Sequence, residues 1–244
     1  MTLRRVGHKG ADHIAPGNTM ASFDAALAAD VDMIEFDVLP ADPRAPQHSV
    51  LRLAHDPDHL GPHAPTLEDG LAHLSAPAFA HVELDLDLKL PGYEARVVDA
   101  LRAHGLVERT LVSTLYMRSL VRLRALEPEL RLGWSVPRVR RDWTAAWWSA
   151  APAYGLLIHV RRRLPGIATQ HIRAGRCDAL MAHWRLVTPR LVDALGAAGG
   201  DLYVWTVDDP ARIRALEALG VTGIITNDPR LFSGSSTRSR RSPR

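Results

Sequence analysis

Short runs rich in β-branched and other apolar residues alternate along this chain with longer segments that have helical spacing. A period of two is typical of a strand, and a period near 3.6 is typical of a helix. The pattern predicts eight main strands, at Arg4–His8, Met33–Val38, His81–Lys89, Thr110–Leu115, Arg131–Val136, Asp178–Trp184, Leu202–Val207 and Gly223–Thr226. A further strand, Val50–His55, is expected to pair beside the second. Helices are expected at Thr19–Ala29, Thr66–Leu74, Glu94–His104, Arg118–Ala125, Pro189–Ala198 and Pro210–Leu219.

Strands that alternate with helices of this length form parallel β-α-β units. Eight such strands favour an α/β fold, a single (β/α)8 TIM barrel formed by residues 1–232. A doubly wound open sheet is the alternative with the same periodicity, but the chain has no Gly-x-Gly-x-x-Gly turn to support it. Residues 233–244 are expected to form a separate disordered tail, rich in serine and arginine.

The segment Arg138–Arg176 does not follow this alternation. Its tryptophans, Trp143, Trp147 and Trp148, have helical spacing, which favours packing in a core over a ligand-binding role. The three consecutive arginines at 161–163 are expected on a solvated helix face.

Two of the expected strands alternate apolar with charged residues. Residues 34–38 read Ile-Glu-Phe-Asp-Val, and residues 82–89 read Val-Glu-Leu-Asp-Leu-Asp-Leu-Lys. Because successive side chains of a strand point to opposite faces, one face of each strand is apolar and packs under the helices of a barrel. The other face points into the barrel, and it carries Glu35, Asp37, Glu83, Asp85, Asp87 and Lys89.

Inward carboxylates are costly to bury unless they are paired or bind a cation. Those at the C-terminal ends of the strands lie where barrels of this kind have their active sites. Carboxylate oxygens from neighbouring strands suit a hard divalent cation such as Mg²⁺ or Ca²⁺. The alternation by itself fits equally well an exposed antiparallel strand with its polar face in water.

Two histidines stand at strand ends beside these carboxylates. His8 ends the first strand, and His55 ends the extra strand. Since an imidazole titrates near neutral pH, such a pair could serve as general acid and general base. The chain has 12 histidines, and His48, His59 and His63 are interpreted as loop residues.

Charge and composition narrow the function classes. The formal net charge is +3, but the segment Ser233–Arg244 holds four arginines and no acidic residue, so that −1 remains for the rest. No nucleic-acid partner is therefore expected. The single cysteine, Cys177, cannot form an internal disulfide and favours a reducing compartment. No apolar run approaches the roughly 20 residues of a membrane span and no signal peptide is visible, so a cytoplasmic location is expected.

Four ordered motifs carry a resemblance to a known family. The chain reads His-Lys-Gly-Ala at 8–11, Pro-Gly-Asn-Thr at 16–19, Glu-Phe-Asp at 35–37 and His-Asp at 55–56. These motifs resemble His-Arg-Gly-Ala, Pro-Glu-Asn-Thr, Glu-x-Asp and His-Asp of the glycerophosphodiester phosphodiesterase family, in the same order and at similar spacing. The resemblance covers nearly the whole chain except Arg138–Arg176 and the tail, since it continues at residues 65–68, 87–89, 204–208 and 223–226.

The resemblance implies a barrel with a site for metal-assisted phosphodiester hydrolysis. Carried over by motif, Glu35, Asp37 and Asp87 would be ligands of one divalent cation, Mg²⁺ or Ca²⁺, with Mn²⁺ as a further candidate. His8 and His55 would be the acid/base pair.

The resemblance also implies how a small-molecule phosphodiester would be held. Lys9 and Lys89 would contact phosphate oxygens, and Trp205 would wall the pocket for the alcohol part of the substrate. The implied products are glycerol 3-phosphate and an alcohol, with either water or the glycerol 2-hydroxyl as the first nucleophile.

Three positions depart from the family's pattern. Lys9 replaces an arginine, so a bidentate phosphate contact becomes a single ammonium contact. Gly17 replaces a glutamate, while the adjacent Asn18 is expected to cap the helix that starts near Thr19. Asp87 stands where the family usually has glutamate. An aspartate there also occurs in related sphingomyelinase D-type enzymes, so the substrate class stays open.

Four further residues stand at the ends of the later strands. Asp208 and Asn227 are expected to cap the helical turns before Pro210 and Pro229 rather than to line the pocket. His183 and Trp184, at the end of the sixth strand, are further pocket candidates.

Two other functions are considered. A lysophospholipase D-type hydrolase would need an apolar lip, for which Trp143, Trp147, Trp148 and residues 156–158 are candidates. A non-catalytic binding barrel is disfavoured because both histidines, the Glu-x-Asp pair and the lysine are all present. The sequence sets no oligomeric state.

Overall fold

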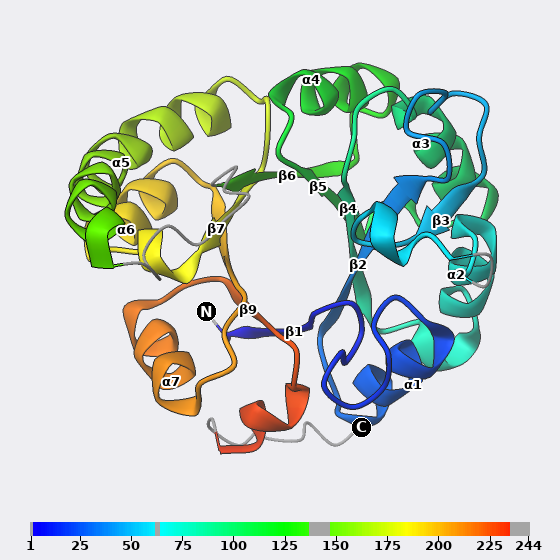
Figure 1. Cartoon of the computed structure of the whole chain (residues 1–244), viewed down its shortest axis with the longest axis horizontal. Coiled ribbons are helices and arrows are strands. Elements are labelled where there is room, and N and C mark those ends of the chain that lie inside the picture. Colours follow the sequence, from blue (N-terminus) through cyan, green and yellow to red (C-terminus); the bar gives the residue numbers. More distant parts are fainter. Residues whose placement is uncertain (1, 62–63, 137–146, 235–244) are drawn as a thin grey trace, which may run out of the picture.

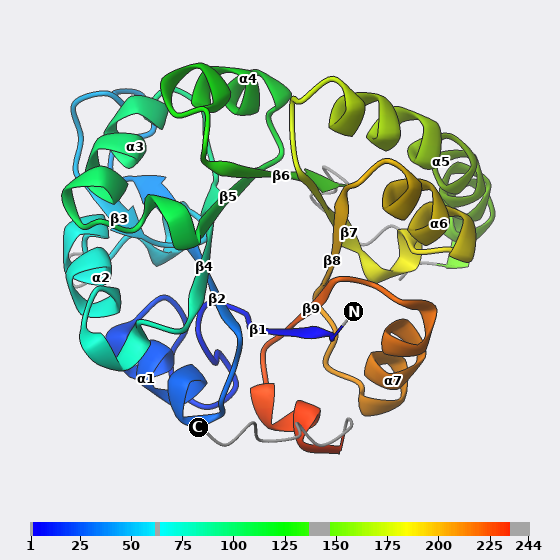
Figure 2. The same cartoon turned by 180° about the vertical axis from the view of Figure 1, so that it is seen from behind.

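Eight parallel strands close into a barrel that is surrounded by helices (Figures 1 and 2). The computed structural model describes residues 2–61, 64–136 and 147–234. Direct pairing of the first strand with both the second and the last closes the ring, which confirms the (β/α)8 barrel and excludes the open doubly wound sheet. Around the ring the strands are β1 (Arg4–Gly7), β2 (Met33–Pro40), β4 (Glu83–Leu88), β5 (Thr110–Thr114), β6 (Arg131–Val136), β7 (Ala179–His183), β8 (Asp201–Trp205) and β9 (Gly223–Thr226).

The extra strand lies outside the ring. β3 (Leu51–Leu53) pairs antiparallel with the last residues of β2, with Leu53 opposite Val38. β2 is therefore extended at its C-terminal end to carry β3. As a result, His55 comes directly after β3 at the C-terminal rim of the barrel, where strand ends and loops meet.

Four of the helices begin at side-chain caps that the sequence supplies, at Thr19, Thr66, Thr188 and Asp209. Thr19 and Ser22 form a reciprocal capping box at the first helix, and Thr66 and Asp69 form one at the second. All six expected helices are present, together with one in the segment that has no clear pattern. Their bounds are α1 (Met20–Ala28), α2 (Leu67–Leu74), α3 (Glu94–Ala103), α4 (Met117–Leu126), α5 (Trp147–Arg173), α6 (Pro189–Ala197) and α7 (Pro210–Leu219).

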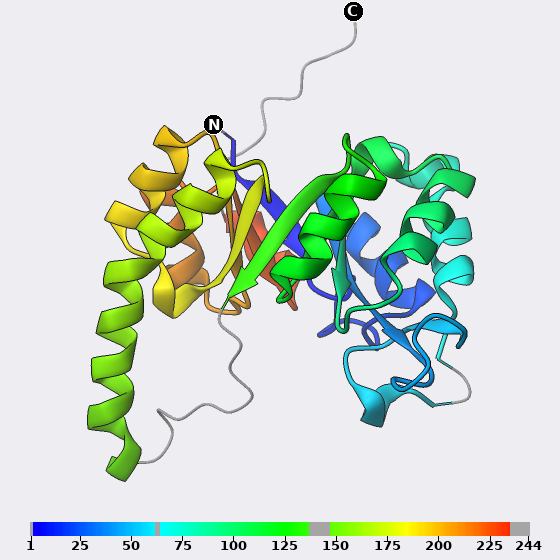
Figure 3. The ribbon, with the colours of Figure 1, turned by 90° about the horizontal axis from the view of Figure 1, so that it is seen from above.

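Helix α5 is longer than the barrel is tall. Its first half extends past the ends of the strands on the side where β6 ends, as Figure 3 shows. Arg162 and Arg163 are exposed as expected, whereas Arg161 is half-buried and donates from Nε to the backbone oxygen of Arg185 at 2.7 Å. Trp143 and the side chains of residues 147–154 lie outside the described residues, so their expected core packing stays a prediction.

The barrel interior changes in character along its axis. At the N-terminal ends of the strands, Arg4 and Arg131 both pair with Glu83, and Arg131 also lies 3.3 Å from Asp201. The middle is apolar and consists of Val6, Met33, Leu111, Ala179, Met181, Tyr203 and Ile225. The ion-pair layer and the apolar layer together fill the barrel from the N-terminal ends of the strands to its middle. Only the C-terminal end of the interior is left to form a site.

The last described element is a short helical turn, Pro229–Gly234. The expected tail boundary at Ser233 therefore falls inside this turn, and residues 235–244 lie outside the described residues. The other short turns are Pro57–His59, Pro77–Phe79, Val107–Arg109 and Trp184–Leu186. Within the described ranges, no helix is both long and apolar enough to cross a membrane.

Candidate active site

The carboxylates of β2 and β4 meet at the C-terminal end of the barrel. In the parallel register, Glu35 lies opposite Asp85, and Asp37 lies opposite Asp87. One carboxylate oxygen from each of Glu35, Asp37 and Asp87 lies within 4.8 Å of the others. Glu35 and Asp37 are 5% and 0% exposed, which excludes the alternative of a solvated antiparallel strand.

Burial makes these carboxylates costly to ionise. It raises the pKa of Glu35 well above its usual range, with the charge of Asp37 adding to the effect, and it also raises the pKa of Asp87. Asp37 is the exception. Burial opposes its ionisation, but the Lys89 ammonium and His55 hold the pKa of Asp37 well below its usual range.

Lys89 lies among the carboxylates. Its ammonium contacts both Asp37 and Asp87, and only 17% of its side chain is exposed. Burial alone would lower the pKa of Lys89, but these two carboxylates, with Glu35, raise it. The Lys89 ammonium, for which the resemblance implies a phosphate contact, is thus the internal counter-ion of the acidic group.

Asp85 lies two residues before Asp87 on β4 and is 1% exposed. It lines the same pocket, but it does not belong to the group of three carboxylates. Its Oδ1 atom has no hydrogen-bond partner within the described structure, and burial raises its pKa to about 8. An unpartnered buried oxygen of this kind is destabilising unless it serves the site.

The group of three carboxylates fits a divalent cation. All donors are oxygen atoms, as Mg²⁺ and Ca²⁺ prefer. Burial and the neighbouring charge of Asp37 raise the pKa of Glu35 and Asp87, and a bound cation would offset both effects. Among the described residues, it is the only group of three or more potential ligands with this proximity.

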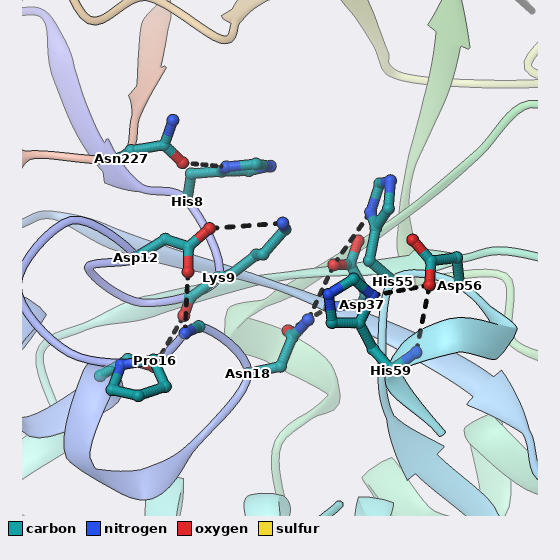
Figure 4. Close-up of polar contacts among 12 residues, drawn as sticks. His8, Lys9, Asp12, Pro16, Asn18, Asp37, His55, Asp56, His59 and Asn227 are labelled. Atoms are coloured by element: carbon teal, nitrogen blue, oxygen red, sulfur yellow. Dashed lines mark hydrogen bonds and ion pairs between the residues drawn. The ribbon is translucent and has the colours of Figure 1, made fainter. Parts of the chain in front are cut away.

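His8 lies directly after β1, with its side chain 18% exposed. Its Nε2 atom lies 3.8 Å from a carboxylate oxygen of Glu35, and its Nδ1 atom lies 2.5 Å from Oδ1 of Asn227 (Figure 4). Burial lowers the pKa of His8. The lowered pKa favours the neutral ring, and Nε2 is the ring nitrogen that faces the carboxylates.

Asn227 and Asp208 do not cap the turns that follow them. Asp209, not Asp208, caps α7 by accepting from the backbone N–H of Arg212. Asp208 instead accepts from the amide group of Asn227 at 2.7 Å and from its backbone N–H at 2.8 Å. The expected capping roles of Asp208 and Asn227 are therefore wrong. The two residues connect the ends of β8 and β9 to His8.

His55 reaches the carboxylates from the other side. Its Nδ1 atom lies 3.2 Å from Oδ2 of Asp37, while 46% of its side chain is exposed. Its neighbour Asp56 turns away and caps the turn Pro57–His59, where it also contacts the ring of His59 (Figure 4). The two histidines therefore approach the same acidic group from β1 and from the loop after β3.

The loop between β1 and α1 is anchored to the metal-ligand candidates. The backbone N–H of Lys9 donates to Glu35 at 2.9 Å. The amide group of Asn18 donates to Asp37, and Oδ1 of Asn18 accepts from the backbone N–H of Asp37. The prediction that Asn18 caps α1 is wrong, because Thr19 takes that role and leaves Asn18 free to orient Asp37.

These residues surround a cavity of about 490 Å³. Lys9, Lys89 and Trp205 all line it, as the sequence predicts. His183 and Trp184 do not belong to its described lining. His183 packs edge-on against Trp205 at 5.3 Å, and Trp184 lies under the guanidinium group of Arg212. The lining is completed by polar and apolar residues of the other strand ends, among them Ser113, Ser135, Tyr116, Leu115, Met181 and Thr206.

The model of the glycerophosphoryl diester phosphodiesterase family matches residues 8–40 and 64–231. The chain belongs to this family. The match spans the barrel and includes every candidate site residue named above except His55. The prediction of a phosphodiesterase enzyme is thereby confirmed at the level of the family.

Relatives named glycerophosphodiester phosphodiesterase are similar over most of their length. A glycerophosphodiester phosphodiesterase of Caldanaerobacter subterraneus is 23% identical over 92% of this chain and 93% of its own. One of Bacillus subtilis is 22% identical over 93% of this chain and 84% of its own.

Solved structures share the fold. A glycerophosphodiester phosphodiesterase of Parabacteroides distasonis has a TM-score of 0.71 at 18% identity and covers 96% of this chain and 100% of its own. A phosphodiesterase of Oleispira antarctica, solved with the product sn-glycerol-3-phosphate, has a TM-score of 0.69 at 20% identity over 95% of this chain and 96% of its own.

Three contributions to the site could not be predicted from the sequence. These are the link from Asp208 through Asn227 to His8, the contact of Asn18 with Asp37, and the unpartnered oxygen of Asp85. The only sequence signal for the first was the position of both residues at ends of neighbouring strands. A polar residue at that position fits a cap and a pocket equally well, so the pattern could not separate them.

Proposed function

We propose that this protein hydrolyses glycerophosphodiesters to glycerol 3-phosphate and an alcohol, with one divalent cation and two acid/base histidines. One observation carries the proposal. His8 and His55 flank a single group of three buried carboxylates in one cavity, and each ring is held by a different partner. Membership of the family and the fold shared with phosphodiesterases support the same chemistry.

We assign the cation to Glu35, Asp37 and Asp87, with Mg²⁺ or Ca²⁺ as the first candidates and Mn²⁺ as the next. When bound, the cation supplies positive charge to a phosphate oxygen of the substrate. The raised pKa values of Glu35 and Asp87 support this assignment, because both carboxylates would ionise more readily beside such a charge.

We assign the role of general base to His8. Asn227 accepts at Nδ1, so the lone pair of the neutral ring is on Nε2, which faces the acidic group. Burial keeps His8 neutral by lowering its pKa, as a base requires. His8 takes the proton of the attacking nucleophile, which is either water or the 2-hydroxyl of the glycerol group.

We assign the role of general acid to His55. The Asp37 carboxylate, 3.2 Å from Nδ1, orients the ring of His55. With Nδ1 bound to Asp37, Nε2–H is free to protonate the oxygen of the leaving alcohol. The exposure of this side chain fits a group that meets the leaving alcohol at the pocket mouth.

Lys9, Lys89 and Trp205 are assigned to substrate binding. Both lysines line the cavity, and their ammonium groups can contact phosphate oxygens as point charges. Trp205 forms an apolar wall that suits the alcohol part. The cytoplasmic location expected from the sequence stays a prediction.

A lysophospholipid substrate is the second candidate. One observation favours it: on α5, Leu156 and Ile158 are 64% and 37% exposed. An apolar segment there could contact an acyl chain. Hydrolysis of lysophosphatidylcholine faster than glycerophosphocholine would support this candidate.

A substrate panel tests the proposal. Glycerophosphocholine, glycerophosphoethanolamine and lysophosphatidylcholine are each incubated with Mg²⁺, Ca²⁺ or Mn²⁺ and with a chelator, and the products are identified. We expect metal-dependent release of glycerol 3-phosphate. A transient cyclic phosphate would identify the glycerol hydroxyl as nucleophile. Binding without turnover under every condition would instead establish a binding barrel.

A further inference from the structure

Two departures from the family's motifs lie side by side in the loop after β1. Lys9 stands where the motif has arginine, and Gly17 stands where it has glutamate. Asp12 contacts both positions. Its Oδ2 lies 3.4 Å from the ammonium of Lys9, and its Oδ1 accepts from the backbone N–H of Gly17 at 2.8 Å (Figure 4).

Gly17 is required for space. A Cβ atom at this position would lie 2.5 Å from Oδ1 of Asp12 and 2.8 Å from Cβ of Lys9, closer than real contacts allow. Gly17 is not among the glycines with positive φ, so its backbone conformation does not itself require glycine. The carboxylate of Asp12 thus occupies the volume into which a side chain at position 17 would project.

The main chain of Lys9 is fixed independently of Asp12. Its φ of 50° is in the left-handed region, and its N–H donates to Glu35. The four-carbon side chain beyond that anchor is flexible, whereas an arginine would carry a rigid planar group. Asp12 supplies a partner for the ammonium at the edge of the cavity that Lys9 lines.

We propose that Asp12 is a positioning residue that holds the Lys9 ammonium for the substrate phosphate, and that Gly17 exists to admit it. The inference rests on the proposed function through the role of Lys9. On this account the carboxylate of Asp12 holds the ammonium that stands in place of the motif's arginine, and it fills the space beside Gly17. An ammonium that pairs with one carboxylate keeps two N–H donors for phosphate oxygens.

The direction in which phosphate affinity changes when Asp12 is removed distinguishes a positioning role from a purely electrostatic one. A carboxylate near a bound phosphate repels it, so removal of Asp12 should strengthen binding if its charge alone matters. If Asp12 positions Lys9, its removal should weaken binding. The expected loss is about 2–5-fold, the range of a partly exposed ion pair.

The experiment measures KM and kcat for a glycerophosphodiester and, by calorimetry, the Kd of inorganic phosphate with Mg²⁺ present. Asp12→Ala should raise KM and Kd and leave kcat within about 2-fold. In a Lys9→Met background, Asp12→Ala should cause no further loss, because Asp12 acts through Lys9. Asp99→Ala, which removes an exposed carboxylate paired with Arg102 on α3, is the matched control.

A rescue variant completes the test. Gly17→Glu should raise KM and lower Tm, because the new side chain collides with Asp12. The double variant Asp12→Ala/Gly17→Glu should recover part of the KM loss, since a carboxylate again faces Lys9. Its Tm should recover less, because the new Cβ still lies 2.8 Å from Cβ of Lys9. Additive losses in the double variant, or an unchanged or lower Kd in Asp12→Ala, would overturn the proposal. A wild-type protein that binds phosphate but hydrolyses none of the diesters would reject the proposed function and leave the binding test of Asp12 intact.

Discussion

The side-chain oxygen of Asn227 lies 2.5 Å from Nδ1 of His8. Asp208 decides which end of that amide faces the histidine, because its carboxylate can only accept and therefore binds the NH₂ group of Asn227. Oδ1 of Asn227 is then left to face His8, so the ring must donate from Nδ1. The lone pair of the neutral ring is consequently on Nε2, as a base at the acidic group needs.

Removal of the amide tests this relationship. Asn227→Ala should lower kcat by about 10–100-fold, because His8 loses the group that selects its orientation and tautomer. The measurement is kcat with saturating metal, beside the Tm of the variant. A variant with wild-type kcat would show that His8 does not depend on Asn227.

A charged residue at the same position should shift the pH profile. Burial lowers the pKa of His8 in the wild type, so the acid limb of kcat/KM should fall below the ordinary range of histidine. Asn227→Asp would place a carboxylate beside the ring, favour the imidazolium and raise that pKa. Because the base must be neutral, the acid limb should move to higher pH. An unmoved limb would assign the observed pKa to another group.

The histidines themselves should affect turnover and not folding. His8→Ala and His55→Ala should each lower kcat by roughly 10²–10⁴-fold, the usual contribution of a general acid or base. Neither should change Tm much, since neither side chain is part of the hydrophobic core. His59→Ala, with its side chain 72% exposed, is the control. Near-full activity of either variant would remove that histidine from the mechanism.

Metal titration distinguishes the two aspartates of β4. Asp87→Asn should raise the metal concentration for half-maximal activity strongly, because Asp87 shares the oxygen cluster with Glu35 and Asp37. Asp85→Asn should raise it less, because Asp85 lies outside that cluster. A larger shift for Asp85→Asn would mean that the ligand assignment is wrong.

Asp85→Asn should weaken metal binding slightly but should raise the stability of the fold. The folded state holds the pKa of Asp85 near 8, whereas the unfolded chain ionises this group at its ordinary lower pKa. Between those values unfolding releases a proton, so rising pH favours unfolding. Asp85→Asn removes this penalty and should raise the Tm of the metal-free protein by about 2–4 °C for each kcal/mol recovered.

The pH dependence of Tm tests this prediction for Asp85. The difference in Tm between Asp85→Asn and the wild type should grow as pH rises from about 5 to 8. Asp193→Asn, which changes an exposed carboxylate on α6, should show no such growth. A lower Tm for Asp85→Asn across this range would show that the ionised carboxylate stabilises the fold through a partner.

Much of the fold could be predicted because its determinants are local. The alternation of residues 34–38 and 82–88 placed the apolar side chains of both strands under the helices, where Ile34, Phe36, Leu84 and Leu86 are fully buried. A strand has a period of two whatever surrounds it, so the inward face of β2 and β4 followed from the sequence. Helix α5 was missed because its residues mix apolar, aromatic and arginine positions without a clear apolar stripe.

The sequence by itself determined which residue types stand at the strand ends, and it thereby predicted the acidic group and both histidines, while the resemblance to the family implied the pocket lysines. The tertiary structure alone decided their partners. His8 and Asn227 are 219 positions apart, and they meet because β1 pairs with β9 when the barrel closes. The roles of Asp208 and Asn18 changed for the same reason. A short polar side chain satisfies either a local cap or a distant partner, and only the closed ring brings the distant partner within hydrogen-bond reach.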